Sequence, residues 1–220
     1  MPDALAADLA ALLDSTARLG ATLDSLDDEQ ARRPSLLPGW SVGHVLTHLA
    51  RNADGMLHHV DWALSGVAHP MYASGDARGA DIEAGAGRPA AALAADVRGS
   101  ADRLAVGLDR LGAAGPEELD RLLLFGPPRP EAEPDTPARA LPYARRREVE
   151  IHHVDLGLGY GPRDWPADFV ERTLILVHGR SGAVDAVGEP ADVLAWRLGR
   201  PATGPVRRRD GSDVGEPPPW

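Results

Sequence analysis

Leucine side chains recur at helical spacing over the first 26 residues of the chain. The stretch DALAADLAALLDSTARLGATLDSL carries them mostly three or four positions apart, at Leu5, Leu9, Leu12, Leu13, Leu19, Leu23 and Leu26. This spacing, with one break, places them along one face of an α-helix. A helix with a single apolar face is stable when that face is buried against another element. The pattern therefore predicts an amphipathic helix that packs inside a helical domain.

Further segments predict helices of similar length. Ser41 is a suitable N-cap for a helix from Val42 to about Ser65, because its hydroxyl can accept a hydrogen bond from the first turn. Another helix is expected from about Pro89 to Leu111, where a second apolar stripe recurs at helical spacing. The Gly-rich segment HPMYASGDARGADIEAGAGRP between these two helices predicts a loop.

A fourth long helix is expected between Thr136 and about Leu156. Thr136 followed by Pro137 is typical of an N-cap and a first helical position. Pro142 should kink this helix or delay its start, because proline lacks the backbone N–H that a helix interior uses. Four long helices joined by Pro-rich and Gly-rich connections predict a four-helix bundle.

The chain beyond residue 160 predicts a smaller second domain. The segments ADFVERTLILVHG and EPADVLAWRLGR each read as a helix, and the remaining tail is polar and Pro-rich. We therefore expect a mainly α protein, with a helix bundle over residues 1–160 and a reduced C-terminal domain and tail, either α/β or helical, over residues 161–220.

Charge and hydropathy argue against several classes of partner. The net charge of −10 and the pI near 5.2 disfavour nucleic acid or an anionic membrane as the main partner. No apolar run reaches the roughly 20 residues of a membrane span. The segment MPDALAADLAALLDST is acidic and amphipathic, unlike a signal peptide. These features predict a soluble cytoplasmic protein, and they specify no oligomeric state.

Two residue types are missing from the sequence. The chain has no cysteine, which excludes disulfides, thiolate metal ligands and a protein thiol nucleophile. It also has no lysine, so all 23 basic residues are arginine. With the abundance of Ala, Gly and Pro, this composition is typical of a GC-rich genome such as that of an actinomycete.

Two histidine-bearing motifs, one of which also carries an acidic residue, could hold a metal. In RRREVEIHHVDLGLGY, Glu148 and His152 are four residues apart and share a helix face. In WSVGHVLTHLARNADGMLHHVDW, His44 and His48 have the same spacing. Zinc accepts imidazole nitrogen and carboxylate oxygen, and catalytic zinc sites combine three protein ligands with an open position. One histidine of the second motif, with Glu148 and His152, would complete such a set.

Structural roles compete with metal binding for these side chains. Glu148 could form an ion pair with one of the arginines at 145–147. His44 could cap or pack at a helix N-terminus. His58 and His59 are expected at the surface or at a helix end. The remaining charged groups of the chain are expected to be solvated surface.

Two residues near the end of the fourth helix have open assignments. His153 points about 100° away from His152 around the helix, so it is expected to pack or to form hydrogen bonds outside the site. Asp155 could orient a ligand histidine as a hydrogen-bond acceptor, or it could stay solvated.

The motifs LPGWSVGHVLTHLARNADGM and RREVEIHHVDLGLGY together resemble the mycothiol-dependent maleylpyruvate isomerase family, part of the wider group of DinB-like metalloproteins. DIEAGAGRPAAAL and EPADVLAWRLGR are similar to that family too, and the likeness extends from about Leu5 to Arg200. It implies a DinB-like four-helix bundle followed by a smaller α/β domain. Between LILVHGRSG and EPADVLAW, where the family usually carries several short strands, only a few residues remain. The C-terminal domain is therefore expected to be reduced to helices and coil.

The resemblance also implies site residues and cofactors. The positions that match the metal motif of the family are His48, Glu148 and His152, which would hold Zn²⁺. Arg78 best matches an arginine that meets the substrate carboxylate, with Arg88 as the rival. The second cofactor would be mycothiol, a low-molecular-weight thiol of actinomycetes. A chain without cysteine fits a protein that borrows its thiol, and coordination to zinc favours the thiolate.

The function that the resemblance implies is a zinc- and thiol-dependent cis-trans isomerisation. The mycothiol thiolate would add reversibly to the activated double bond of maleylpyruvate. The adduct would have a single bond there, which could rotate before elimination gives fumarylpyruvate. An alternative is a mycothiol S-transferase that releases the conjugate of an electrophilic metabolite. Others are a non-catalytic DinB-like metal-binding protein, or a zinc hydrolase, for which the sequence places no convincing general base. An isomerase consumes no thiol, whereas a transferase consumes one per turnover.

Overall fold

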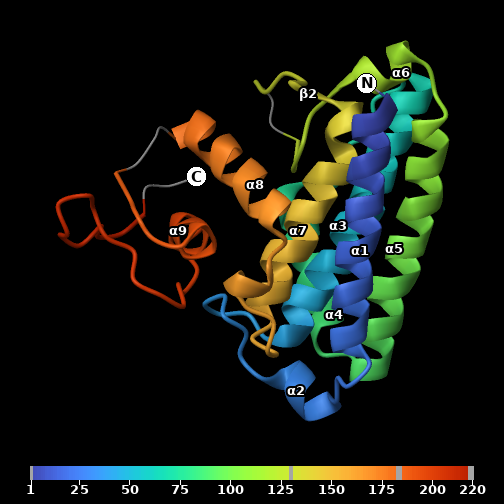
Figure 1. Ribbon diagram of the computed structural model, residues 1–220. Coiled ribbons are helices and arrows are strands. Elements are labelled where there is room, and N and C mark those ends of the chain that lie inside the picture. Colours follow the sequence, from blue (N-terminus) through green and yellow to red (C-terminus); the bar gives the residue numbers. More distant parts are fainter. Residues whose placement is uncertain (1, 129–130, 182–184, 218–220) are drawn as a thin grey trace. The chain divides into compact units, whose positions relative to one another are not determined.

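The computed structural model describes residues 2–128, 131–181 and 185–217 of the 220-residue chain. Over these ranges the protein is mainly α-helical, as predicted (Figure 1). The chain divides into two compact units, Met1–His152 and His153–Trp220. The predicted domain boundary at residue 160 stays a prediction, because compactness does not show where an independently folding domain ends. None of the helices in the described ranges has the length and apolarity needed to cross a lipid bilayer.

The first unit contains the predicted bundle, whose long helices lie side by side in Figure 1. These helices are α1 (Pro2–Leu23), α3 (Val42–Ser65), α5 (Ala90–Gly112) and α7 (Leu141–Asp155). The short helices α2 (Asp28–Arg32) and α6 (Pro116–Asp120) belong to its connections. α3 packs against α5, and α5 packs against α1. The leucine stripes face inward as predicted, with Leu19, Leu93 and Leu108 buried, although Leu13 lies on the exposed side of α1.

Helix α3 begins at Val42 and ends at Ser65, as the sequence predicted. A capping box fixes its start: Ser41 Oγ accepts a hydrogen bond from the His44 N–H, and His44 Nδ1 accepts one from the Ser41 N–H at 3.1 Å. Gly66 ends the helix at φ 75°, a left-handed conformation that favours glycine. Both ends of the helix that carries His48 are therefore defined by local chemistry.

The loop predicted for residues 69–89 is wrong over most of its length, because the structure has helix α4 (Gly75–Ala86) there. Ser74 caps this helix, and its Oγ accepts a hydrogen bond from the Ala77 N–H at 3.0 Å. The glycines that suggested a loop are instead compatible with a helix that packs closely against its neighbour.

Glycines set the close approach of α4 to α3. A Cβ on Gly43 would collide with the carbonyl oxygen of Ala86, and a Cβ on Gly85 would collide with the side chain of Thr47. Side chains at either position would hold the two helices apart. The close packing brings Arg78, which α4 carries, within reach of α3.

Helix α7 begins later than predicted, at Leu141. The expected cap forms strand β2 (Thr136–Pro137), which pairs antiparallel with β1 (Leu122–Leu123), and the 3₁₀ turn η1 (Ala138–Ala140) leads into the helix. The N-cap assignment was therefore wrong. The delaying effect of Pro142 is confirmed, because proline occupies the second helical position, where its missing N–H removes no helical hydrogen bond.

The second unit is small and largely irregular outside its helices. It contains the 3₁₀ turn η2 (Pro162–Asp164), α8 (Ala167–Ser181) and α9 (Pro190–Arg197). Its described residues pair as isolated bridges, Val187 with Arg207 and Arg207 with Asp213. These elements agree with a C-terminal region reduced to helices and coil.

Candidate metal centre

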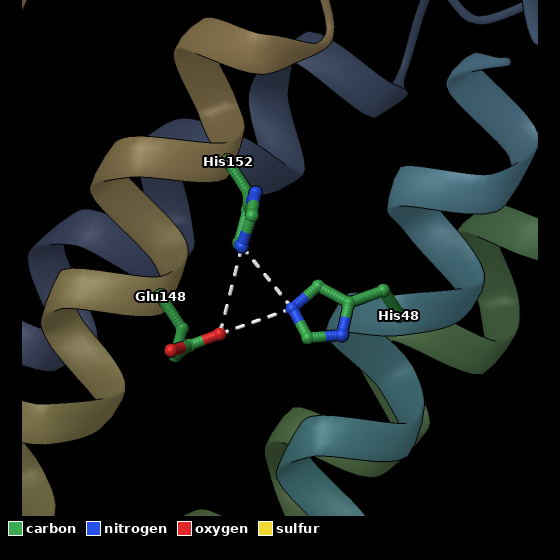
Figure 2. A group of neighbouring side chains, drawn as sticks. All are labelled: His48, Glu148 and His152. Carbon is green, nitrogen blue, oxygen red and sulfur yellow. Dashed lines mark hydrogen bonds and ion pairs between the residues drawn. The ribbon is translucent and has the colours of Figure 1, made fainter. Parts of the chain in front are cut away.

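Side chains from two helices of the bundle converge on one point (Figure 2). His48 comes from α3, and Glu148 and His152 lie one turn apart on α7. His48 Nε2 lies 3.0 Å from Glu148 Oε2 and 3.1 Å from His152 Nε2. His152 Nε2 lies 3.6 Å from Glu148 Oε2. The structure thus brings together the predicted ligands, and their binding of a metal stays a prediction.

The spacing of these atoms suits one small metal ion. Ligands placed tetrahedrally about 2.0–2.1 Å from zinc lie about 3.3 Å from one another. The observed separations of 3.0, 3.1 and 3.6 Å bracket that value. Two imidazole nitrogens and one carboxylate oxygen are a donor set that catalytic zinc sites use, with a further position left open. The residues present therefore fit zinc without rearrangement of the helices.

Burial and mutual contacts set the protonation of two of these groups. Burial lowers the pKa of His48 to about 4, and the hydrogen bond with Glu148 only partly offsets this effect. Burial acts to raise the pKa of Glu148, but the hydrogen bond from His48 and the positive charges of His152 and Arg145 bring that pKa well below its ordinary value. His48 is therefore neutral and Glu148 ionised at neutral pH, which are the forms that bind metals.

Arg78 reaches the second ring nitrogen of His48. Its Nη2 lies 3.0 Å from His48 Nδ1. A guanidinium only donates hydrogen bonds, so Nδ1 is the acceptor and Nε2 carries the proton of the neutral ring. The indole of Trp40 lies against the same imidazole, with ring centroids 5.8 Å apart. Arg78 is thus one contact away from the three converging atoms.

An open cavity of about 510 Å³ adjoins this site at Arg78 and Tyr72. Its other lining residues include Arg51, His58, His69 and Met71. The rings of His58 and His69 stack, with centroids 3.9 Å apart. The lining also holds the carboxylates of Asp54 and Asp81, and Arg51 already pairs with Asp54 and Asp96. A cavity of this size accommodates a small polar molecule, and Arg78 is the lining cation next to the candidate metal centre.

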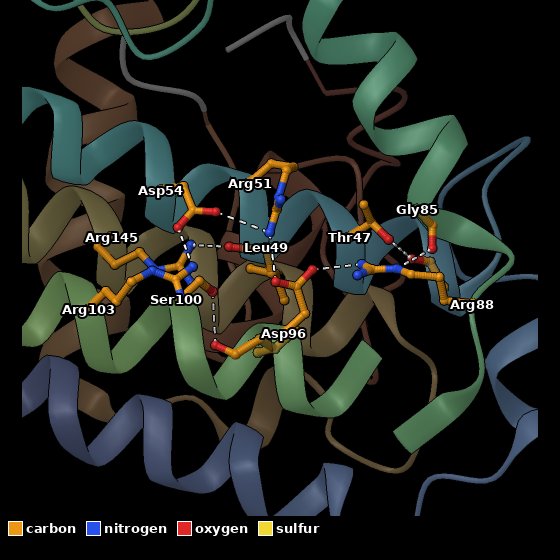
Figure 3. Close-up of polar contacts among 12 residues, drawn as sticks. Thr47, Leu49, Arg51, Asp54, Gly85, Arg88, Asp96, Ser100, Arg103 and Arg145 are labelled. Atoms are coloured by element: carbon orange, nitrogen blue, oxygen red, sulfur yellow. Dashed lines mark hydrogen bonds and ion pairs between the residues drawn. The ribbon is translucent and has the colours of Figure 1, made fainter. Parts of the chain in front are cut away.

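Arg88, the rival of Arg78, is engaged elsewhere (Figure 3). Its Nη2 donates to Asp96 Oδ2 at 2.7 Å, and its Nε donates to the Gly85 carbonyl at 2.9 Å. Asp96 also accepts from Arg51 at 2.7 Å, so these ion pairs join α3 to α5. Arg88 therefore contributes to the packing of the bundle, and Arg78 is the arginine that contacts a candidate ligand.

The other histidines of α3 have separate roles. His44 caps the helix, which was one of the roles expected for it. His59 is fully buried, with its ring against those of Trp62 and Phe125, so the expectation of a surface or helix-end position was wrong. The reason is that α3 packs against α4, α5 and α6, which leaves little of its circumference exposed.

The two residues with open assignments at the end of α7 belong to the second unit. His153 stacks on Tyr160, with ring centroids 3.8 Å apart and planes 3° apart, as expected for a packing residue. Asp155 is fully buried and accepts hydrogen bonds from Arg200 Nε at 3.0 Å and Nη2 at 2.7 Å. The solvated alternative for Asp155 was therefore wrong.

A buried polar pair on α3 and α7 was not predicted from the sequence. Asn52 follows His48 by one turn on α3, and its Oδ1 accepts a hydrogen bond from Arg145 Nη1 at 2.7 Å. Arg145 is buried and also donates to the Leu49 carbonyl at 3.0 Å (Figure 3). The available signal was the spacing of His44, His48 and Asn52, which places three polar side chains on one face of a helix.

Comparison with known proteins finds one matching family model and two similar solved structures. The family model described as the mycothiol maleylpyruvate isomerase N-terminal domain matches residues 12–157. Two solved structures are similar, a mycothiol-dependent maleylpyruvate isomerase and a histidine-to-alanine mutant of that isomerase. Each has a TM-score of 0.85 and 24% sequence identity, over 98% of this chain and 97% of the other. At this identity the likeness shows a shared fold. A search of curated proteins found no match.

Proposed function

Because the chain belongs to the mycothiol maleylpyruvate isomerase family of enzymes, we propose that it is a zinc- and thiol-dependent cis-trans isomerase of maleylpyruvate type. The observation that carries this proposal is the convergence of His48, Glu148 and His152 within 3.0–3.6 Å of one another. The proposed substrate is a small dicarboxylate with an activated double bond.

The three side chains would hold the metal from two helices of the bundle. His48 and His152 would bind through Nε2, and Glu148 through a carboxylate oxygen. A bound metal and thiol would supply a thiolate nucleophile for reversible addition to the double bond. The single bond that results can rotate. The chain has no cysteine of its own, so the sulfur must come from a separate molecule such as mycothiol.

Arg78 is the proposed substrate-binding residue. Its guanidinium lies at the junction of the candidate metal centre and the cavity. From this position it can bind a substrate carboxylate and orient the double bond toward the metal. The cation would also stabilise negative charge that develops on the conjugated oxygen.

Zinc per chain, measured by elemental analysis, tests the ligand set. We expect about one zinc in the wild type, as for a mononuclear site, and a sharp loss in both His48→Ala and Glu148→Ala. His69→Ala is the matched control, because His69 is an exposed histidine outside the ligand set. Loss in both ligand variants and not in the control would place residues of α3 and α7 at one metal.

The concentration of free thiol, measured during turnover, then tests the reaction class. An isomerase leaves the concentration of free thiol unchanged while fumarylpyruvate accumulates. Stoichiometric loss of thiol would instead support the S-transferase alternative. A folded wild-type protein that takes up no zinc even after reloading would contradict the proposed mechanism and favour the non-catalytic binding protein.

A further inference from the structure

Tyr72 lies where the cavity meets the candidate metal centre. It lines the cavity beside Arg78, and the guanidinium carbon of Arg78 is 5.7 Å from the centroid of its ring. Arg78 in turn lies 3.0 Å from the Nδ1 atom of His48. A single residue therefore separates the phenol from a predicted metal ligand.

Two polar neighbours act on the Tyr72 hydroxyl. Arg78 and Asn52 both lower the pKa of the phenol and partly offset the effect of its burial. A guanidinium cannot accept a hydrogen bond, and the amide oxygen of Asn52 already accepts one from Arg145 at 2.7 Å. A substrate oxygen in the cavity that Tyr72 lines would offer an acceptor for the phenol O–H.

The surroundings of Tyr72 keep its hydroxyl protonated. Burial is the main cause that raises the pKa of Tyr72 above its ordinary value, and the nearby charge of Glu148 adds to the effect. The phenol therefore stays protonated at neutral pH and can donate a hydrogen bond to a molecule in the cavity.

The amide near Tyr72 is itself fixed in place. Arg145 is buried and bonds to both the Leu49 carbonyl and Asn52, so the amide cannot rotate without loss of a buried hydrogen bond. Groups held in this way do not need to reorganise when charge appears nearby. Asn52 therefore gives Tyr72 a polar neighbour that stays in position.

We propose that Tyr72 is a further catalytic residue, which donates a hydrogen bond from its O–H to the substrate oxygen that becomes negative during the reaction. This inference rests on the proposed isomerase function. Addition of a thiolate forms a carbon–sulfur bond and moves an electron pair onto the conjugated carbonyl oxygen. Elimination breaks that bond and returns the pair to the double bond, so no proton, oxidant or reductant is consumed. Tyr72 and Arg78 would share the charge on the oxygen while the carbon–carbon bond rotates.

The test is the substitution Tyr72→Phe, which keeps the ring and removes the O–H. We expect kcat to fall about 10²- to 10³-fold, as for loss of one oxyanion donor, while KM changes by less than about threefold because the hydrogen bond strengthens only as charge develops. Zinc per chain and Tm should stay at the wild-type values. Tyr160→Phe is the matched control, because the Tyr160 hydroxyl donates to the Asp164 carbonyl in the second unit, and it should keep wild-type kcat.

Two results would overturn the inference in distinguishable ways. If the wild type isomerises its substrate with thiol and Tyr72→Phe keeps kcat within threefold, Tyr72 has no catalytic role and the proposed function stands. If the zinc-loaded wild type shows no thiol-dependent isomerisation, the proposed function fails, and the role of Tyr72 fails with it.

Discussion

The two nitrogens of His48 face different partners. Nε2 faces Glu148 and His152, and Nδ1 faces Arg78. In a neutral imidazole one nitrogen donates and the other accepts, and here Nδ1 accepts from Arg78. A metal bound at Nε2 would use the lone pair of Nε2, which must first lose its proton. The ring proton would then lie on Nδ1, and Arg78 would lose its acceptor. We therefore expect Arg78 to be available to an anionic substrate in the metal-loaded protein.

Substitution of Arg78 by glutamine tests this role. The change removes the positive charge and keeps a hydrogen-bonding side chain. We expect KM for the dicarboxylate substrate to rise about 10- to 100-fold, which corresponds to the loss of one charge-assisted hydrogen bond of about 1.5–3 kcal/mol. Steady-state kinetics would give KM, and elemental analysis of the same sample should show that zinc per chain is unchanged.

Arg88→Gln is the control at the rival position. It breaks the ion pair with Asp96 on the surface of the bundle, so it should change stability slightly and leave KM within threefold. An equal rise of KM in both variants, or no rise in Arg78→Gln, would contradict the proposed binding of the substrate carboxylate by Arg78.

The candidate ligands could be found from the sequence, whereas the residues around them could not. Glu148 and His152 share a helix face by local spacing, and the resemblance supplied the choice of His48 over His44. Asn52 and Arg145 are 93 positions apart and meet only because α3 and α7 pack together. The spacing of His48 and Asn52 places both on one helix face, but no local feature indicates that Arg145 is the partner of Asn52.

At the level of elements, α4 is the part of the bundle that the sequence concealed. Glycine is a poor helix former, so the run that contains Gly79, Gly85 and Gly87 read as a loop. These glycines differ in what surrounds them. Gly85 permits contact with Thr47, while Gly79 has no atom within 4 Å of the place where a Cβ would lie. Propensity rules cannot separate these cases, because the difference lies in the neighbouring helix.

We therefore expect alanine substitutions at crowded and at open glycines to change the free energy of unfolding in opposite directions. Gly43→Ala places a Cβ against the carbonyl of Ala86 and should lower the free energy of unfolding by about 1–3 kcal/mol. Gly79→Ala lies in the same packed pair of helices but in open space, and it should raise the free energy of unfolding by about 0.5–1 kcal/mol. Urea denaturation of the metal-free protein would measure both. A Gly43→Ala variant as stable as the wild type would contradict the close approach of α3 and α4.

Helix ends were predictable where the capping signal is local. Ser41 correctly predicted the start of α3, and the structure adds that His44 completes a capping box with it. At Thr136 the same kind of signal failed, since a short strand pairing with Leu123 takes that backbone before the helix can begin. A β-bridge formed by residues 13 positions apart competes with a cap and cannot be read from the cap alone.

For the whole molecule, the expectation that charged groups are solvated was wrong at several positions. Glu150 is buried and accepts hydrogen bonds from Ser15 Oγ at 2.5 Å and Arg18 Nη2 at 2.6 Å. Asp192 is buried and accepts hydrogen bonds from two backbone N–H groups. A buried charge is tolerated in a folded protein only with such partners. Breaking a pair leaves an uncompensated buried charge, which destabilises the fold. Composition cannot reveal these groups, because their partners come from other elements.

His59 makes the stability of the metal-free protein depend on pH. Burial lowers its pKa to about 4, and neither ring nitrogen has a hydrogen-bond partner among the described residues. In the unfolded chain its pKa is about 6.5. Between these values the unfolded state binds a proton that the folded state does not, so stability must fall as pH falls from about 6.5 toward 4. His48 contributes in the same direction.

The substitution His59→Gln isolates this contribution, because glutamine is polar and does not titrate. We expect the wild type to lose about 2 kcal/mol more than the variant in free energy of unfolding between pH 7.5 and pH 5, measured by urea denaturation with chelator present. His69→Gln, at an exposed histidine, should follow the wild type. Parallel curves for the wild type and His59→Gln would mean that His59 takes up its proton in the folded protein, and would contradict its burial against Trp62 and Phe125. A difference confined to His59→Gln would show that this one buried imidazole links protonation to the unfolding of the bundle.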